Sequence, residues 1–185
     1  MVLSRSERSH LTEWWFTVDR TVLGLSLLLL AFGIVMLLSA SPPVAMRKDL
    51  PHFFFVQRQL VFAVFGSVLL LAVSFLSPSN IRRLSLALFV LSLISMIGVL
   101  LFGPEINGAQ RWIRISGVSL QPSEILKPAF IVLTAWAFSE GVKRSDVPAN
   151  GVAIGFYVIS AFLLILQPDF GQTLLLTATW VGMFF

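Results

Sequence analysis

Long apolar runs separated by short polar segments constrain this chain more than any other feature. Each run holds roughly 20 mostly apolar residues, which is the length that an α-helix needs to cross the hydrocarbon layer of a membrane. The six predicted spans are Thr21–Ala40, Leu60–Leu76, Leu84–Phe102, Pro122–Phe138, Gly151–Leu166 and Pro168–Phe185. The sequence therefore predicts an all-α fold, a polytopic integral membrane helix bundle.

The composition supports this class. Hydrophobic residues make up 57% of the chain and charged residues only 12%, whereas soluble domains hold about 25% charged residues. The chain therefore cannot cover itself with a solvated surface. Its basic residues are scattered between the spans, a pattern typical of topogenic charge and of contact with anionic lipid headgroups. Nucleic-acid binding is not expected.

The sequence offers little for metal or thiol chemistry. It contains no cysteine, which excludes disulfides and thiolate metal sites. His10 and His52 lie far apart and lack partners at ligand spacing. We therefore expect no metal site and no evident cofactor, while a requirement for a divalent cation stays open.

Both ends of the chain lie close to apolar spans. Some twenty residues precede the first span, which is long for the n-region of a cleaved signal peptide, and the apolar run exceeds the usual h-region. We therefore predict a retained helix, although "SASPPVA" follows it with small residues. The sixth span is still apolar at Phe185, so we expect an N-terminal fragment of a longer protein, with the last span incomplete.

The distribution of cations gives only a weak indication of orientation. With the N-terminus inside, seven Lys or Arg residues fall on the inner side and six on the outer side. The positive-inside rule therefore favours this orientation only slightly. The tight pairs Arg82–Arg83 and Lys143–Arg144 lie in very short loops, as inner anchors tend to do. We therefore predict a cytoplasmic tail at residues 1–20, a transmembrane domain at 21–185 and an outer loop at 103–124.

The outer loop and the start of the next span hold an unusual set of charged residues. The loop reads "GPEINGAQRWIRISGVSLQPSE", with turn signals at Asn107–Gly108 and Ser116–Gly117. Pro122 suits the first helical position, and Glu124 then lies in the first turn, where the helix dipole favours a carboxylate.

Lys127 follows Glu124 at a spacing that puts both on one face of the helix. Pro128 cannot donate to the carbonyl of Glu124 and should bend the helix. Charged groups inside a span normally face the bundle interior or a water-filled cavity. This segment is therefore predicted to form a cavity wall.

Each of these residues also has a plainer interpretation. Trp112 would then be an interfacial belt residue, and Arg111 and Arg114 would only contact headgroup phosphates. Glu124 and Lys127 would form a structural ion pair. The residues alone leave these alternatives open.

Asp169, in "LLILQPDFGQTLLL", also has both a structural and a functional interpretation. Gln167-Pro168-Asp169 repeats the pattern of Gln121-Pro122-Ser123-Glu124, so Asp169 should lie in the first turn of the sixth span. It is either a helix-cap carboxylate at the interface or an ionised group paired with Lys127 or Arg111 beside a polar cavity.

Two motifs, "NGAQRWIRISGVSLQPSEILKPA" and "LILQPDFGQTLLL", occur in order and at a characteristic distance. Together with the span pattern, they closely resemble the shape, elongation, division and sporulation (SEDS) family of integral membrane proteins. The segment "EWWFTVDRTVLG" and the later "SASPPVA" look more like the division branch of the family than the elongation branch.

The resemblance implies a protein of about ten spans in the cytoplasmic (inner) membrane, at the division septum, with its N-terminus inside. It implies a peptidoglycan glycosyltransferase that polymerises lipid II into glycan strands at the outer face of the membrane. The implied partners are lipid II, a division transpeptidase (a class B penicillin-binding protein), other divisome membrane proteins and membrane lipids.

By the family pattern, Arg111, Glu124, Lys127 and Asp169 fall at positions linked to the substrate cavity, and Trp112 and Arg114 stand in the same loop. The family's proposed catalytic aspartate lies in a later outer loop that this chain does not reach. No catalytic residue is therefore assigned in this fragment, which we expect to be inactive alone.

The chemistry of lipid II suits these side chains. Its pyrophosphate is the leaving group, and cations at the outer face can stabilise the developing charge. We hypothesise that Arg111 and Lys127 do this, with Glu124 and Asp169 fixing their orientation. A flippase or transporter for the lipid-linked precursor and a non-catalytic division scaffold are the alternatives.

Overall fold

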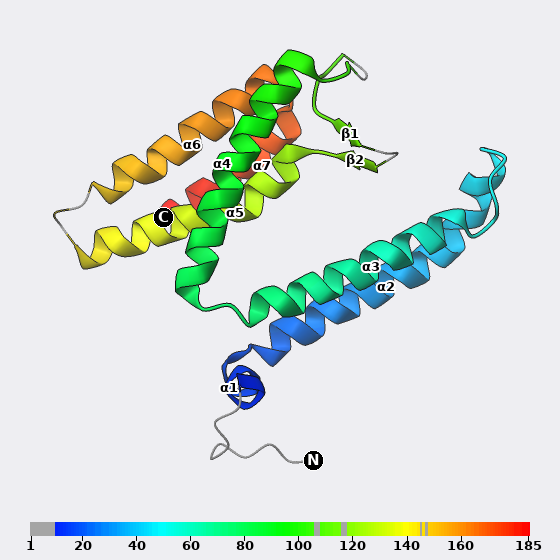
Figure 1. Cartoon of the computed structure of the whole chain (residues 1–185), viewed down its shortest axis with the longest axis horizontal. Helices are drawn as coiled ribbons and strands as arrows, with labels where there is room; N and C mark the ends of the chain where they lie inside the picture. Colours follow the sequence, from blue (N-terminus) through cyan, green and yellow to red (C-terminus); the bar gives the residue numbers. More distant parts are fainter. Residues whose placement is uncertain (1–9, 106–107, 116–117, 145, 147) are drawn as a thin grey trace. The chain divides into compact units, whose positions relative to one another are not determined.

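The computed structural model describes residues 10–105, 108–115, 118–144, 146 and 148–185 (Figure 1). The chain divides into two compact units, residues 1–76 and 77–185, called here the N-terminal unit and the C-terminal unit. Helices dominate both, which confirms the predicted all-α class. Five helices of the described residues are long and apolar enough to cross a membrane.

The N-terminal unit contains the short helix α1 (His10–Thr17) and the long helices α2 (Arg20–Met46) and α3 (Phe54–Ser74). The Asp19 carboxylate caps α2 by accepting hydrogen bonds from the backbone N–H groups of Thr21 and Val22, at 2.9 and 3.1 Å. At the far end, the Ser41 hydroxyl donates to the His52 carbonyl at 3.0 Å. The two long helices therefore pack side by side as a hairpin (Figure 1).

Helix α1 lies within the segment that we predicted only as a tail. The Trp14 indole N–H donates to the Ser74 hydroxyl at 2.8 Å, and its ring stacks on Phe75 with centroids 4.8 Å apart. An indole with one polar edge suits the boundary between lipid and water. These contacts hold α1 against the C-terminal end of α3. The cytoplasmic placement of residues 1–20 stays a prediction.

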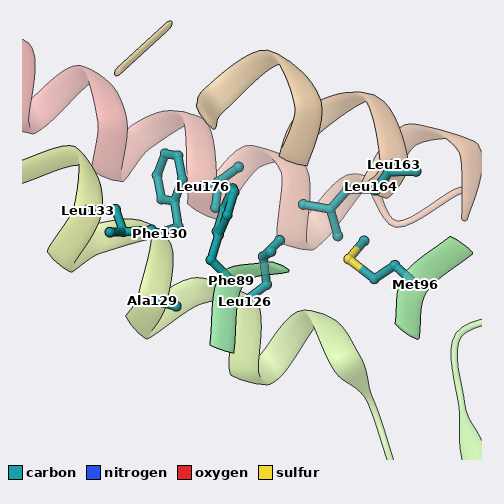
Figure 2. Packing of buried hydrophobic residues seen from close by; sticks show 9 residues of the cluster. All are labelled: Phe89, Met96, Leu126, Ala129, Phe130, Leu133, Leu163, Leu164 and Leu176. Atoms are coloured by element: carbon teal, nitrogen blue, oxygen red, sulfur yellow. The ribbon is translucent and has the colours of Figure 1, made fainter. Parts of the chain in front are cut away.

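The C-terminal unit contains α4 (Pro78–Phe102), α5 (Pro122–Lys143), α6 (Ala149–Leu166) and α7 (Phe170–Phe184). Helix α5 packs against the other three. Its buried side chains join those of its neighbours in one cluster (Figure 2). The cluster consists of Phe89, Met96, Leu126, Ala129, Phe130, Leu133, Leu163, Leu164 and Leu176. Helix α5 is therefore the centre of this unit.

A small β-hairpin lies between α4 and α5. Strands β1 (Ile113–Ile115) and β2 (Val118–Leu120) pair antiparallel, with Arg114 opposite Ser119. We did not predict these strands, because the segment is too short to show a clear alternating pattern. Gly108, in the predicted turn before the hairpin, has a positive φ of 76°, which glycine adopts without steric cost. Asn107 and the turn predicted at Ser116–Gly117 lie outside the described residues.

Several helix boundaries differ from the predicted spans. Helix α2 continues through Pro42 and Pro43 to Met46, so the predicted end at Ala40 was too early. Helices α3 and α4 begin six residues before the predicted Leu60 and Leu84. Helix α7 begins at Phe170, because Asp169 is its N-cap rather than a first-turn residue. The apolar runs mark the lipid-facing part of a helix, whereas polar caps outside those runs set where it ends.

Substituting Phe130, which is 0% exposed, tests the packing of the C-terminal unit. Phe130→Ala should lower the free energy of unfolding by about 3 kcal/mol, because it leaves a cavity beside α4 and α7. The matched change Phe162→Ala, at a side chain 60% exposed, should cost about 0.5 kcal/mol or less. Titration with SDS in mixed micelles, followed by circular dichroism, measures both. Equal losses would contradict the packing in Figure 2.

Candidate functional site

The helical path is interrupted between α6 and α7 by the three residues 167–169, called here the break. The candidate site is built around this break. Helix α6 ends at Leu166 and α7 begins at Phe170. Carbonyl groups at a helix end lack partners within the helix. Arg111, from the segment before β1, is the hydrogen-bond partner of two carbonyl groups in the break. Its Nε donates to the Gln167 carbonyl at 3.0 Å and its Nη2 to the Pro168 carbonyl at 2.6 Å.

Gln167 anchors the same break from the other side. Its side chain is 1% exposed, and its amide donates to the Met96 carbonyl of α4 at 3.2 Å. A buried amide that is hydrogen-bonded avoids the penalty of an unpaired polar group. The break is thus fixed to α4 by Gln167 and to the loop before β1 by Arg111.

Asp169 combines two of the roles that the sequence left open. It is the N-cap of α7, where its carboxylate accepts from the Gln172 backbone N–H at 3.5 Å. The same carboxylate forms an ion pair with Arg111, with Nη1 and Oδ1 3.5 Å apart, and accepts from the Gln121 amide at 3.0 Å. Its side chain is only 9% exposed. The predicted pairing with Arg111 is confirmed; Lys127 bonds to other groups.

Lys127 belongs to a closed triangle with Glu124 of α5 and Gln172 of α7. Its Nζ lies 2.8 Å from Glu124 Oε2 and donates to Gln172 Oε1 at 2.8 Å. The Gln172 amide closes the triangle by donating to Glu124 Oε1 at 2.9 Å. The predicted pairing of Glu124 and Lys127 is therefore confirmed, and the triangle joins α5 to α7.

The two cations differ in how many donors they have left. Three nitrogens of the Arg111 guanidinium already contact two carbonyls and Asp169. Lys127 carries three N–H donors, of which the described residues engage two, and its side chain is 19% exposed. Lys127 is therefore the better placed of the two to contact an anion, while Arg111 acts mainly as a clamp.

Trp112 and Arg114 lie apart from these hydrogen bonds. Both line a cavity of about 330 Å³ between β1 and the C-terminal end of α4, together with Ser95, Gly98, Val99, Phe102, Gly103, Pro104 and Ile113. Four predicted site residues thus form a hydrogen-bonded network and two line a neighbouring cavity. That all six contact one substrate stays a prediction.

Three glutamines belong to the site although we did not predict them as site residues. Gln121, Gln167 and Gln172 each bond to a residue from another element. The repeated Gln-Pro pattern drew attention to Gln121 and Gln167. Their hydrogen-bond partners could not be predicted, because these partners are distant in sequence. Ser123, 1% exposed, has a hydroxyl without a hydrogen-bond partner in the described part of the chain.

Over the described residues, His, Cys, Asp and Glu side chains form no group of three that could hold a metal ion. The expectation of no metal site and the open question of a divalent cation stay predictions. The network itself can do two things chemically. It can hold the Lys127 cation at a fixed position through charge-assisted hydrogen bonds, and it can present the third N–H of that cation to an anion.

Substitutions of the two acidic residues should have unequal effects on stability. Asp169→Ala should lower the free energy of unfolding by about 3 kcal/mol, because it removes a helix cap and leaves the Arg111 cation without its carboxylate. Glu124→Ala should cost about 1 kcal/mol or less, since that side chain is 53% exposed. Unfolding in mixed micelles measures both. A larger loss for Glu124→Ala would contradict the central place of Asp169.

Comparisons with known proteins agree with this architecture. Residues 19–185 match the model of the family described as "Cell cycle protein", which covers FtsW, RodA and SpoVE. A protein of Caulobacter vibrioides called "Probable peptidoglycan glycosyltransferase FtsW" is 40% identical over 182 residues, which are 98% of this chain and 47% of that protein. The chain spans about half the length of the curated relatives it matches.

Two solved structures show the same fold. The crystal structure of the Rod shape determining protein RodA of Thermus thermophilus is 31% identical with a TM-score of 0.70, over 88% of this chain and 51% of that one. A chain of a peptidoglycan synthase complex is 28% identical with a TM-score of 0.58, over 79% of this chain and 44% of that one. From its motifs, its helices and these likenesses, the chain belongs to the family of membrane proteins that includes FtsW, RodA and SpoVE.

Proposed function

We propose that this chain forms the N-terminal part of a peptidoglycan glycosyltransferase of cell division, which polymerises lipid II at the outer face of the inner membrane. The name of the Caulobacter relative supports the activity and the division branch. The observation that carries the proposal for this site is Lys127. Glu124 and Gln172 hold its ammonium group in place while its third N–H has no acceptor among the described residues.

Glycan polymerisation breaks the bond between a sugar and its pyrophosphate. A hydroxyl of the acceptor sugar attacks the anomeric carbon, the pyrophosphate leaves with the bonding electrons, and a base takes the hydroxyl proton. A fixed ammonium group near the leaving oxygens lowers the barrier, because it stabilises charge that develops only in the transition state. Lys127 supplies that group. Its pairing with Glu124 and Gln172 fixes its position before the substrate binds.

Asp169 does not supply the base. Its carboxylate already accepts hydrogen bonds from Gln121 and the α7 backbone and pairs with Arg111. These partners occupy both carboxylate oxygens and leave little room for a substrate hydroxyl. Asp169 therefore positions Arg111, and Arg111 positions the junction of α6 and α7 next to the triangle of Lys127, Glu124 and Gln172. We therefore assign no catalytic base among the described residues of this chain.

The remaining features of the proposal rest on the family to which the chain belongs. The N-terminus lies in the cytoplasm, the loop of residues 103–124 lies outside, and the protein works at the septum with a class B penicillin-binding protein. The relative that is part of a peptidoglycan synthase complex supports a transpeptidase partner. The flippase and scaffold alternatives predict no sugar transfer by the purified protein. An assay of glycan-chain formation from lipid II therefore separates them from the polymerase.

Neutralising Lys127 in the full-length protein tests the proposal. Lys127→Met keeps most of the side chain but removes the charge, and should lower the polymerisation rate by about 100-fold or more, as the loss of one transition-state donor does. The measurement is the formation of glycan chains from purified lipid II, with the partner transpeptidase present.

The matched control is Lys143→Met, at the opposite end of α5, where the side chain is 66% exposed and lies 3.9 Å from Glu140. This variant should keep its rate within about twofold, because exposed ion pairs contribute little. Normal polymerisation by Lys127→Met, at equal protein abundance, would reduce Lys127 to a structural role.

A further inference from the structure

A second polar feature of the C-terminal unit lies far from the Arg111 network, beside the first turns of α4. A hollow of about 290 Å³ opens there between three helices. Its lining comes from Ser79, Arg82, Arg83 and Leu86 of α4, Leu133 and Trp136 of α5, and Phe156 of α6. The network occupies the other end of the same helices, since Arg111 follows the C-terminal end of α4.

The positive charge of this hollow has no ion-pair partner in the described part of the chain. Over the described residues, no acidic side chain forms an ion pair with Arg82 or Arg83, and the first turn of α4 carries no acidic residue. The N-terminal end of a helix adds a partial positive charge of its own. Two guanidinium groups and a helix terminus therefore meet at one place, and the described residues place no acidic ion-pair partner there.

An aromatic ring fixes one of these cations. The Arg82 guanidinium lies over the Trp136 ring, 5.7 Å from its centroid. A guanidinium stacked in this way keeps its N–H edge available for hydrogen bonds. Ser79 lines the same hollow, and a serine hydroxyl is a further potential donor. This arrangement presents several donors to one anion, whereas topogenic charge requires neither a hollow nor an aromatic support.

The remaining lining is apolar and is held in place by packing. Leu133 is 2% exposed, and Phe156 packs edge-on against Phe89 with centroids 5.1 Å apart. Leu86 and Trp136 are 50% and 37% exposed, so the hollow is open along one side. A ligand that fits has an anionic head and an apolar body that continues along the helices.

We propose that this hollow binds an anionic phospholipid of the adjoining leaflet. Arg82, Arg83 and Ser79 contact the phosphate of its headgroup, and the acyl chains lie against Leu86 and Trp136. Guanidinium groups bind phosphate oxygens through paired hydrogen bonds. A zwitterionic lipid brings its own cation to the site and gains less from two arginines. The site is therefore selective for net negative lipids, and it is independent of the proposed substrate site.

Native mass spectrometry of the purified protein with equal amounts of phosphatidylglycerol and phosphatidylcholine tests the proposal. The unsubstituted protein should retain phosphatidylglycerol preferentially after delipidation. The double variant Arg82→Gln, Arg83→Gln should lower the ratio of bound phosphatidylglycerol to phosphatidylcholine by about tenfold, which corresponds to the loss of one charge-assisted hydrogen bond.

The matched control is the double variant Lys143→Gln, Arg144→Gln. It removes the same charge from the end of α5, about two turns beyond Trp136, from two exposed side chains outside this hollow. Its lipid ratio should stay within about twofold of the unsubstituted protein. An equal loss in both double variants would mean general attraction to the membrane surface and would overturn the proposal, as would an unchanged ratio in the Arg82 and Arg83 variant.

A second measurement uses only the unsubstituted protein, so it tests the proposal even if a variant folds poorly. Phosphatidylglycerol with a photoreactive acyl chain is bound to the unsubstituted protein, cross-linked and mapped by peptide mass spectrometry. Cross-links should gather in the peptides that contain Leu86 and Trp136. Cross-links elsewhere only, or a polypeptide segment or partner protein found in the hollow in place of lipid, would overturn the proposal.

Discussion

The hydrogen bonds from Arg111 to the break between α6 and α7 are the interaction on which the candidate site depends. A chain that reverses direction in three residues exposes carbonyl groups where lipid offers no partner for them. Arg111 satisfies two of those carbonyls and pairs with Asp169 next to them. One side chain thus stabilises the end of α6, the start of α7 and the loop before β1.

The position of Lys127 follows from this arrangement. Once the break is fixed, α7 starts at a defined place, and Gln172, three residues after its cap, comes within reach of Glu124 and Lys127. The packing of α5 against α4, α6 and α7 keeps the other side of the triangle in place. The cation is therefore positioned by backbone and packing, and it needs little rearrangement when an anion binds.

The sequence predicted the class of fold well because apolar runs of span length have a single physical solution in lipid. It also predicted the pair of Glu124 and Lys127, since helical spacing alone brings them together. The continuation of α2 through Pro42 and Pro43 was missed, because two adjacent prolines usually mark the end of a helix.

The long-range part of the site could not be predicted in the same way. Arg111 and Asp169 are far apart in sequence, and the residues left Lys127 and Arg111 as equal candidates for the partner of Asp169. The choice depends on how the loop before β1 folds over the break, which is a matter of tertiary packing. Gln172 was missed for the same reason, since nothing local distinguishes it from a lipid-facing glutamine near the interface.

A double-mutant cycle between Arg111 and Asp169 tests the central claim most directly. Arg111→Gln and Asp169→Asn are made separately and together, and the free energy of unfolding of each protein is measured in mixed micelles. If the pair holds the break together, the two changes should be non-additive, with a coupling free energy of about 1–3 kcal/mol. Additivity within about 0.5 kcal/mol would contradict the claim and show that the break is stable without this pair.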